Sequence, residues 1–417
     1  MCLFYANLKY DKVSKMRTAF IMPENLQTTE IYTVEVQCYE CALTVKLPIL
    51  KESQKAQCPR CGYTLSAIHR NANERIVAFA ITALIFLIAS LPFKFLSFSA
   101  NGLENHFDAI TSFFVLIDNN YQLLALIEFL TIFAIPTVVL LSVIYLLIPM
   151  NKGLYPKHGR QVLGMVFKLL PWSMVEIFLI GALVSLIKII SMAEIELGLS
   201  FYAFILFALS MTIVILHIDK RELYQLLAKV EKAHKIEIQQ SQSKVAQENP
   251  ITHALSVQKT WALLITAVIL YIPANTLPIM TTHFLGQNDP STIIGGVILL
   301  WKGGSYPIAA IVFFASVVIP VAKILVLSWL NYSVQKQSHR LSLQRVKLYR
   351  MAEFVGRWSM IDVFVVIILA SLIQLGPTMS ITPGAATLAF SGLVIVTMLA
   401  AMSFEPQLIW NDRKKYE

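Results

Sequence analysis

Long apolar runs alternate with short polar connections along most of this chain. A helix rises about 1.5 Å per residue, so a run of about 20 apolar residues crosses a hydrocarbon core of about 30 Å. Runs of this length predict eight membrane-spanning helices, at residues 76–98, 121–149, 171–191, 197–217, 260–282, 305–332, 357–376 and 378–404. The sequence therefore predicts an all-α, polytopic membrane protein.

The composition supports a membrane protein and argues against a nucleic-acid-binding one. Of the 417 residues, 56% are hydrophobic and 14% are charged, whereas a soluble domain carries about 25% charged residues. The net charge is +9, but the basic residues flank the predicted spans and form no stripe interleaved with aromatic residues. The polar N-terminal region that precedes the first span contains no apolar segment typical of a cleavable signal peptide.

The charges of the connections predict the orientation. Residues 150–170 hold four Lys or Arg and no acid, and residues 333–357 hold six against one acid. Residues 99–120 instead hold three acids and no Lys or Arg. By the positive-inside rule, basic connections face the cytoplasm, so we expect both termini to be cytoplasmic.

An internal repeat divides the spans into two sets of four. Trp-Ser-Met at 172–174 recurs at 358–360, and an acid follows at the same offset, Glu176 in the first copy and Asp362 in the second. Pro136 and Pro320 recur at nearly that offset inside the second span of each set. An even number of spans per copy gives both copies the same sense across the membrane, so the repeat predicts two parallel tandem four-helix units.

Four cysteines near the N-terminus form a metal-binding pattern. Cys-x2-Cys-x16-Cys-x2-Cys matches the spacing of a four-cysteine zinc site, and a disulfide is not expected because cytoplasmic thiols stay reduced. Four protein ligands leave zinc no open position for catalysis, so we expect one structural Zn²⁺. The ligands are Cys38, Cys41, Cys58 and Cys61.

These patterns predict the following division of the chain. Residues 1–75 form a cytoplasmic region with a zinc ribbon at about 35–68, and 76–218 form the first membrane unit. Residues 219–259 form a polar, helical linker, 260–405 the second membrane unit and 406–417 a cytoplasmic tail.

Several segments resemble the paraquat-inducible protein A family. They are the four-cysteine ribbon, PANTLPI at 273–279, GGVILLW at 295–301 with GSYP at 304–307, and VGRWSMIDVF at 355–364. The resemblance covers nearly the whole chain and implies an inner-membrane component of a phospholipid transport system, with no enzymatic activity. It also implies a periplasmic partner, an MCE-domain protein that forms a tunnel toward the outer membrane. Many members carry a second ribbon between the membrane halves, but residues 218–259 here contain no cysteine.

Three polar residues in the second unit are expected at similar depth in the membrane. Counting from the cytoplasmic ends of their spans, Asp362 lies about 8 Å in, Thr397 about 10 Å and Lys323 about 13 Å. Ionisable residues inside spans are costly and commonly functional. We therefore expect Asp362 and Lys323 to face each other, with Ser316, Ser359 and Thr397 nearby, as a transport site.

Other interpretations of these charges remain open. Asp362 and Lys323 can form a structural ion pair or extend to the interface. The first unit has an apolar residue, Val139, near the position of Lys323, which favours the second unit as the working site. Glu128 lies toward the periplasmic side of its span and is expected to reach the interface.

Energy and substrate are less constrained by the sequence. No G-x-x-x-x-G-K-[ST] motif is present, so ATP would come from a partner, and proton coupling through Asp362 and Lys323 is the natural alternative. A proton-coupled exporter of amphipathic toxic compounds, acting without an MCE partner, is the second hypothesis. A membrane enzyme such as a quinone reductase is a weaker third.

Overall fold

A computed structural model describes the greater part of the chain. The described residues are 34–47, 54–67, 72–100, 103–108, 111–189, 194–235, 250–284, 287–304, 306–336, 341–373 and 379–410.

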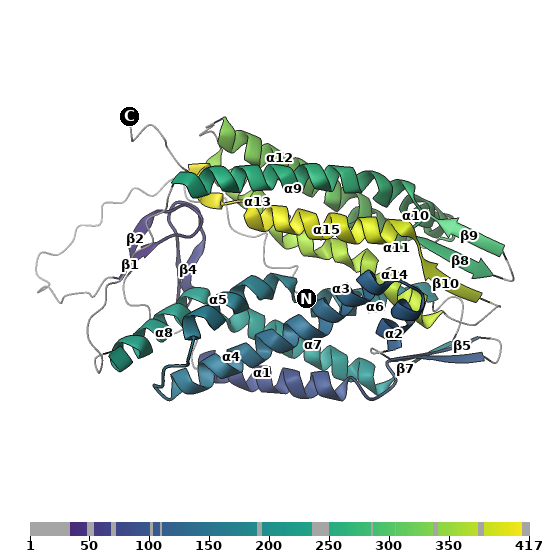
Figure 1. Cartoon of the computed structure of the whole chain (residues 1–417), viewed down its shortest axis with the longest axis horizontal. Helices are drawn as coiled ribbons and strands as arrows, with labels where there is room; N and C mark the ends of the chain where they lie inside the picture. The colour runs from purple at the N-terminus through teal and green to yellow at the C-terminus, as the bar shows by residue number, and fades with distance from the viewer. Residues whose placement is uncertain are drawn as a thin grey trace, which may run out of the picture.

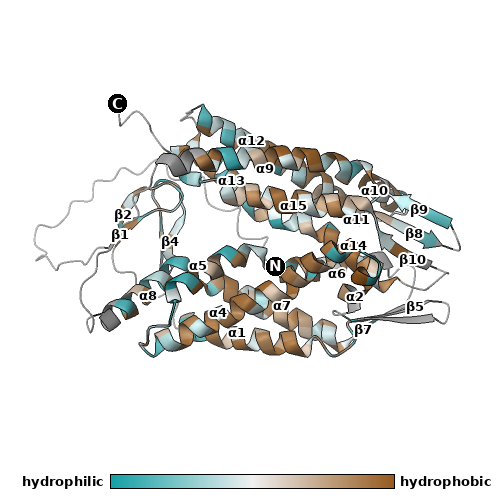
Figure 2. Ribbon diagram, in the orientation of Figure 1, coloured by the Kyte–Doolittle hydropathy of each residue, from teal (hydrophilic) through white to brown (hydrophobic). Residues whose placement is uncertain are grey.

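Eight helical segments in the described residues are long and apolar enough to cross a membrane, which confirms the predicted number. They run side by side, with apolar residues along their middle and polar residues toward both ends (Figure 2). The segments are Ala72–Ala89, Gln122–Asn151, Gly159–Leu186, Leu199–His217, Leu255–Thr276, Ala309–Gln335, Ser342–Leu372 and Ala385–Ser403.

The two units have the same order of elements. The first contains α1 (Ala72–Ala89), α2 (Thr111–Asp118), α3 (Gln122–Phe129), α4 (Ile135–Asn151), α5 (Gly159–Leu169), α6 (Val175–Ile189) and α7 (Leu199–His217). The second contains α9 (Pro250–Thr276), α10 (Ile293–Lys302), α11 (Tyr306–Phe313), α12 (Ile319–Gln335), α13 (Ser342–Gly356), α14 (Ile361–Leu372) and α15 (Ala385–Ser403). The strands of both units lie at one end of the molecule, so the units are parallel (Figure 1).

Both copies carry the same irregularity around their repeated proline. A π-helical turn, η1 (Leu130–Ala134), precedes α4 and Pro136, and η3 (Phe314–Val318) precedes α12 and Pro320. Proline cannot donate a backbone hydrogen bond, and a π-turn is a common way to accommodate the disrupted ladder. The same π-turn is therefore present next to the repeated proline in both units.

Small antiparallel sheets extend the strand-bearing end, and the sequence analysis did not predict them. The first sheet has the order β6-β5-β7, from β5 (Leu96–Ala100), β6 (Leu103–Phe107) and β7 (Glu194–Leu197). The second has the equivalent order β10-β8-β9, from β8 (Met280–Phe284), β9 (Gln287–Ser291) and β10 (Met379–Pro383). Parts of these strands were assigned to the ends of spans, because their apolar residues continue the runs of the neighbouring helices.

A repeated glycine joins each sheet to its last span. An added Cβ at Gly198 would lie 1.8 Å from the Lys94 carbonyl oxygen, and one at Gly384 would lie 2.1 Å from the Pro278 oxygen. Only a residue without a side chain permits this approach of two backbones. Because the two glycines are separated by the same offset as Trp172 and Trp358, the tight connection belongs to the repeated unit.

Helices α6 and α14, which are equivalent in the repeat, form the contact between the units. Phe178 packs edge-on against Phe364 with ring centroids 5.6 Å apart, and the Cα of Gly181 faces Phe364 so closely that an added Cβ would lie 3.1 Å from its Cβ. The span containing α14 is the most buried of the eight, with 83% of its apolar stretch inside the protein.

The polar linker begins with a helix, α8 (Lys220–Lys235), and the second unit begins with α9 at Pro250. The ribbon consists of two hairpins, β1 (Val34–Gln37) with β2 (Thr44–Leu47) and β3 (Lys55–Gln57) with β4 (Thr64–Ala67). It lies at the end of the molecule opposite the sheets (Figure 1).

Candidate functional site

The four ribbon cysteines meet at the tips of the two hairpins. The sulfurs of Cys38 and Cys61 are 3.5 Å apart, as are those of Cys41 and Cys58. All four are buried, and their sulfurs lie within 4.8 Å of one another. Each knuckle closes in the same way, with Ala42 and Gly62 at positive φ after the second cysteine of each pair. The predicted ligands therefore form one cluster that can hold a metal ion.

The chemistry of this cluster suits a soft divalent metal. Four sulfurs around one point match the tetrahedral thiolate sites of structural zinc. Burial raises the pKa of the Cys41 thiol to about 12 and also acts on Cys58, but backbone N–H groups of Cys61 and Arg60 outweigh it and lower the pKa of Cys58 to about 7. The thiolate, and not the thiol, is the metal ligand, so binding of an ion by this cluster would deprotonate the cysteines that still carry a proton.

The ribbon docks on the second membrane unit through charged side chains. Arg350 on α13 binds both carboxylate oxygens of Glu40, with its Nε 2.8 Å from Oε1, and donates to the Cys61 carbonyl at 3.0 Å. The guanidinium of Arg60 stacks over Trp410, 4.4 Å from the ring centroid. Trp410 belongs to η5 (Pro406–Trp410), so the start of the expected tail is a short helix packed on the ribbon.

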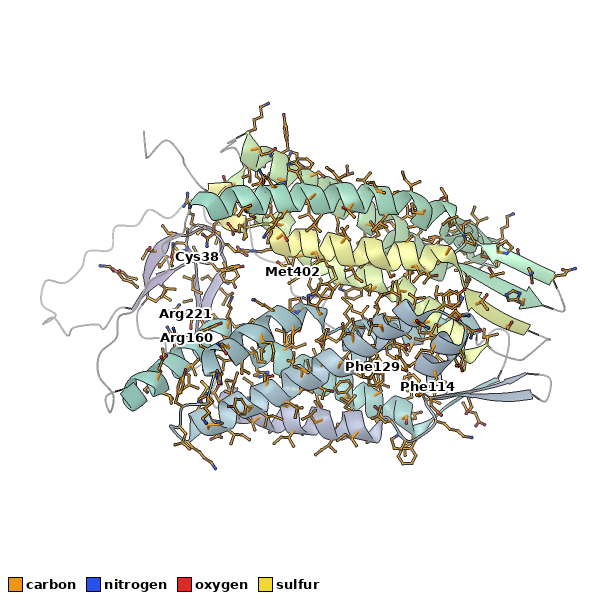
Figure 3. All side chains as sticks on the ribbon, viewed as in Figure 1. Cys38, Phe114, Phe129, Arg160, Arg221 and Met402 are labelled. Carbon is orange, nitrogen blue, oxygen red and sulfur yellow. The ribbon has the colours of Figure 1, made fainter. Side chains whose placement is uncertain are left out.

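The ribbon also touches the end of the first unit. Arg221 on α8 donates to the Leu65 carbonyl oxygen at 3.2 Å, and Lys220 lies 5.2 Å from the ring centre of Tyr39. Figure 3 shows Cys38 and Arg221 at the same end of the molecule. The ribbon thus bridges the ends of both membrane units, a role that sequence reasoning did not assign to it.

The structure places Asp362 against Ser316, as predicted. The Asp362 carboxylate contacts the hydroxyl of Ser316, which also lies 2.6 Å from the carbonyl oxygen of Val312 in its own helix. Both residues line a cavity of about 60 Å³ between α10, η3 and α14. Its walls are otherwise mostly apolar, so the carboxylate is the main charge facing this space.

Lys323 contacts Thr397, which was also predicted. Its Nζ donates to the Thr397 hydroxyl at 2.9 Å and lies 3.4 Å from the Gly356 carbonyl oxygen. An added Cβ at Gly356 would lie 2.8 Å from Nζ, so a larger residue there would require the Lys323 side chain to move. Lys323 borders a cavity of about 130 Å³ that is also lined by Glu353, Arg357 and, from the first unit, Leu170 and Pro171.

Asp362 and Lys323 therefore have different hydroxyl partners and line different cavities. The facing contact that we expected between the two ions is not among the described contacts of Lys323. Ser359 lies in the sequence between Gly356, which contacts Lys323, and Asp362. It is 1% exposed, and its hydroxyl has no hydrogen-bond partner among the described residues.

The first unit arranges its acids differently. Glu176, the equivalent of Asp362, accepts a hydrogen bond from Thr212 on α7 at 2.7 Å. Glu128 was expected to reach the interface, but this prediction is wrong, because the residue is 1% exposed and bonded to Ser112 at 2.8 Å. The short helix α2, which was not predicted, covers it.

The contacts of Arg350 predict how firmly the ribbon is held. Arg350→Gln removes the cation that pairs with Glu40, whose residue is only 4% exposed, and should cost about 2 kcal/mol, as expected for hydrogen bonds to charged groups. We expect a lower melting temperature and faster proteolysis within residues 34–67. Lys347→Gln, at an exposed position on the same helix, is the control. Equal stability of the two variants would contradict the docking described here.

Comparisons with known proteins agree with the repeat. Two stretches, residues 73–228 and 257–414, each match the family model of paraquat-inducible protein A. The intermembrane transport protein PqiA of Escherichia coli (strain K12) is 35% identical over 406 residues, which cover 92% of this chain and 97% of that protein. A probable intermembrane transport protein of Haemophilus influenzae is 30% identical over 421 residues, 94% of this chain and 100% of its own.

A third relative is more distant. The lipophilic envelope-spanning tunnel protein A of Escherichia coli (strain K12) is 26% identical over 391 residues, 90% of this chain and 91% of that protein. No solved structure matches the chain. With two copies of the family model and relatives aligned over nearly the full length, the chain belongs to the paraquat-inducible protein A family.

Proposed function

We propose that this protein is the inner-membrane component of an intermembrane phospholipid transport system. It passes lipid between the inner membrane and a periplasmic tunnel formed by an MCE-domain partner. The observation that carries the proposal is the full-length similarity to proteins named intermembrane transport protein. The third and more distant relative, named lipophilic envelope-spanning tunnel protein A, supports the same class of activity.

The charge pattern supports an orientation for this system. The described residues of the basic connections 150–170 and 333–357 lie at the ribbon end, and those of the acidic connection 99–120 lie at the end with the sheets. By the positive-inside rule, the ribbon and both termini face the cytoplasm. The two sheets then project into the periplasm, where a tunnel protein would sit.

The hydroxyl beside Asp362 supports a role for a proton. A serine hydroxyl carries one hydrogen, and Ser316 lies within hydrogen-bond distance of the Val312 carbonyl while it also contacts Asp362. When that hydrogen goes to the carbonyl, the contact with Asp362 requires a proton on the carboxyl group. Asp362 can therefore gain and lose a proton as its cavity changes, which would couple transport to the proton gradient.

Lys323 supports a different task in the same unit. Its buried ammonium borders a cavity between the two units whose walls include Met398 and Met402. A cation above an apolar wall matches the phosphate and the first methylenes of a phospholipid. We assign Lys323 and Thr397 to headgroup binding and Asp362 and Ser316 to proton binding, with Ser359 on the helix segment that joins them.

The transport system can be tested by its partner and its cargo. Affinity purification from a native envelope should recover an MCE-domain protein and bound phospholipid, both identified by mass spectrometry. An exporter of amphipathic toxic compounds would need no such partner. Recovery of the protein alone, together with drug efflux from proteoliposomes, would favour the exporter and reject lipid transport.

The metal is proposed to be one structural Zn²⁺. Metal analysis of purified protein should give about one zinc per chain, since the cluster has four sulfur ligands for one tetrahedral ion. Cys58→Ser should lower the zinc content, and Cys2→Ser should leave it unchanged. A content near zero in reduced protein, or near two, would be inconsistent with this site.

The proton site predicts a difference between the two units. Asp362→Asn keeps the shape but cannot exchange a proton, so it should reach the membrane and lose most phospholipid transport. Glu176→Gln, the matched change in the first unit, should retain it. Complementation of a strain that lacks redundant lipid transporters, with expression verified, measures both. Full activity of Asp362→Asn would leave the residue a structural role only.

A further inference from the structure

Glu128 is a buried acid in the membrane part of the first unit to which the transport site gives no role. It lies on α3, six residues after the helix begins at Gln122, which places it about 9 Å inside the strand-bearing end. Ser112 on α2 donates to its Oε1 at 2.8 Å. Its Oε2 has no hydrogen-bond partner among the described residues, and the residue is 1% exposed.

Aromatic side chains lie next to Glu128, and no cation among the described residues is hydrogen-bonded to it. Phe113 packs on Phe129 with ring centroids 5.5 Å apart, next to Ser112 and Glu128 in the chain. Figure 3 shows Phe114 and Phe129 on this helical hairpin, near the sheets. The α2–α3 connection and the neighbouring helices carry further acids, Asp118 on α2, Glu176 on α6 and Asp362 on α14.

Helix α6, one of the helices near Glu128, also carries a base, Lys188, whose side chain is outside the described part of the structure. Neither oxygen of Glu128 is hydrogen-bonded to a cation in the structure, since Oε1 accepts from Ser112 and Oε2 has no partner among the described residues.

The second unit has no counterpart of this acid. The equivalent strands β5 and β8 and the equivalent turns η1 and η3 are related by one common displacement along the chain. The same displacement relates Ser112 to Gly296 and Glu128 to Val312. Gly296 and Val312 line the cavity that contains Ser316 and Asp362. In the second unit, these positions line the cavity beside Asp362. In the first unit, the same positions hold a serine, Ser112, and a second carboxyl group, that of Glu128.

An ionised carboxylate is strongly disfavoured in this position. A charge in a water-excluded site needs an opposite charge or several hydrogen bonds, whereas Glu128 has one hydroxyl. A neutral carboxylic acid leaves at most one weak acceptor unsatisfied, which is a smaller penalty. The hydroxyl of Ser112 can accept the acid hydrogen as readily as it donates its own.

We infer that Glu128 is a second proton-binding site of this protein, which holds its proton at neutral pH while α2 covers it. This inference does not rest on the proposed transport function, because it concerns the protonation state of one group. It assigns to the first unit a proton site at a different place in the fold from that of Asp362.

A protonated acid in an apolar site has a diagnostic reaction. Dicyclohexylcarbodiimide takes the acid proton on one nitrogen, and the carboxylate oxygen bonds to its central carbon. The adduct contains all atoms of both reactants, so no oxidant or further reagent is needed. An exposed glutamate, with an ordinary pKa of about 4.3, is ionised at pH 7 and lacks this proton.

The test combines labelling with infrared spectroscopy on the full-length protein. At pH 7, the wild type should give a carbodiimide adduct at Glu128 in peptide mass spectra. It should also show the carbonyl stretching band of a protonated acid, which is missing from Glu128→Gln. Ser112→Ala should keep the band but shift its frequency, because the hydrogen bond to the acid is lost. Glu176→Gln and Asp362→Asn are matched controls that identify the bands of the other acids.

Each outcome decides the inference. A wild-type spectrum from which Glu128→Gln removes only carboxylate bands shows an ionised Glu128 and overturns it. If Glu128→Gln does not fold, the shift in Ser112→Ala decides, and an unchanged acid band would reject the site. An adduct at Glu128 in folded wild type supports it without any variant.

Discussion

Helices α6 and α14 lie against each other at the centre of the molecule, and Gly181 sets how closely they approach. The phenylalanine pair 178 and 364 and the missing side chain at 181 let two equivalent helices pack directly. Lipid tails are as apolar as the helices, so close van der Waals packing, rather than the hydrophobic effect, holds such an interface together. The burial of α14 follows from this contact, and with it the burial of Asp362.

The same backbone carries different polar groups in its two copies. Both have the π-turn before a proline, the three-stranded sheet and the glycine that meets a backbone carbonyl. These features satisfy backbone hydrogen bonds inside and at the edge of the hydrocarbon, a requirement that every spanning unit shares. The acidic side chains take no part in these backbone hydrogen bonds, so they can differ between the two copies. Glu128 exists only in the first copy, whereas Ser316 and Lys323 occur only in the second.

The sequence contained enough information for the spans, the repeat and the cysteine cluster, and too little for several contacts. Apolar length predicts a span because the bilayer has a fixed thickness, and cysteine spacing predicts ligands because a knuckle has a fixed geometry. β5 and β8 were missed because their first residues continue the run of the preceding predicted span, whereas β6 and β9 lie in connections too polar to show an apolar run. The helix over Glu128, α2, was missed because its eight residues are too few for a span and lie in a connection that was interpreted only by its charge.

Depth along a span was a weaker guide to contact than it was to burial. Asp362, Lys323 and Thr397 are all buried, but which groups meet depends also on rotation about each helix axis, which counting from the end of a span does not give. Ser316 and Lys323 lie on one span, yet one turns to α14 and the other to α15.

The ribbon contacts the same helix that contacts Lys323. Arg350, which binds the ribbon, and Gly356, whose carbonyl faces Lys323, belong to the same helix, α13. A shift of the ribbon along or around α13 would move that carbonyl and the adjoining cavity wall. Because the ribbon also holds Arg221 at the end of the first unit, it resists a change in the angle between the units at the end where Lys323 is found. The Asp362 cavity is lined by Ile279 and Met280 at the start of β8 and so lies nearer the sheets; the two polar sites therefore lie at different distances from the ribbon.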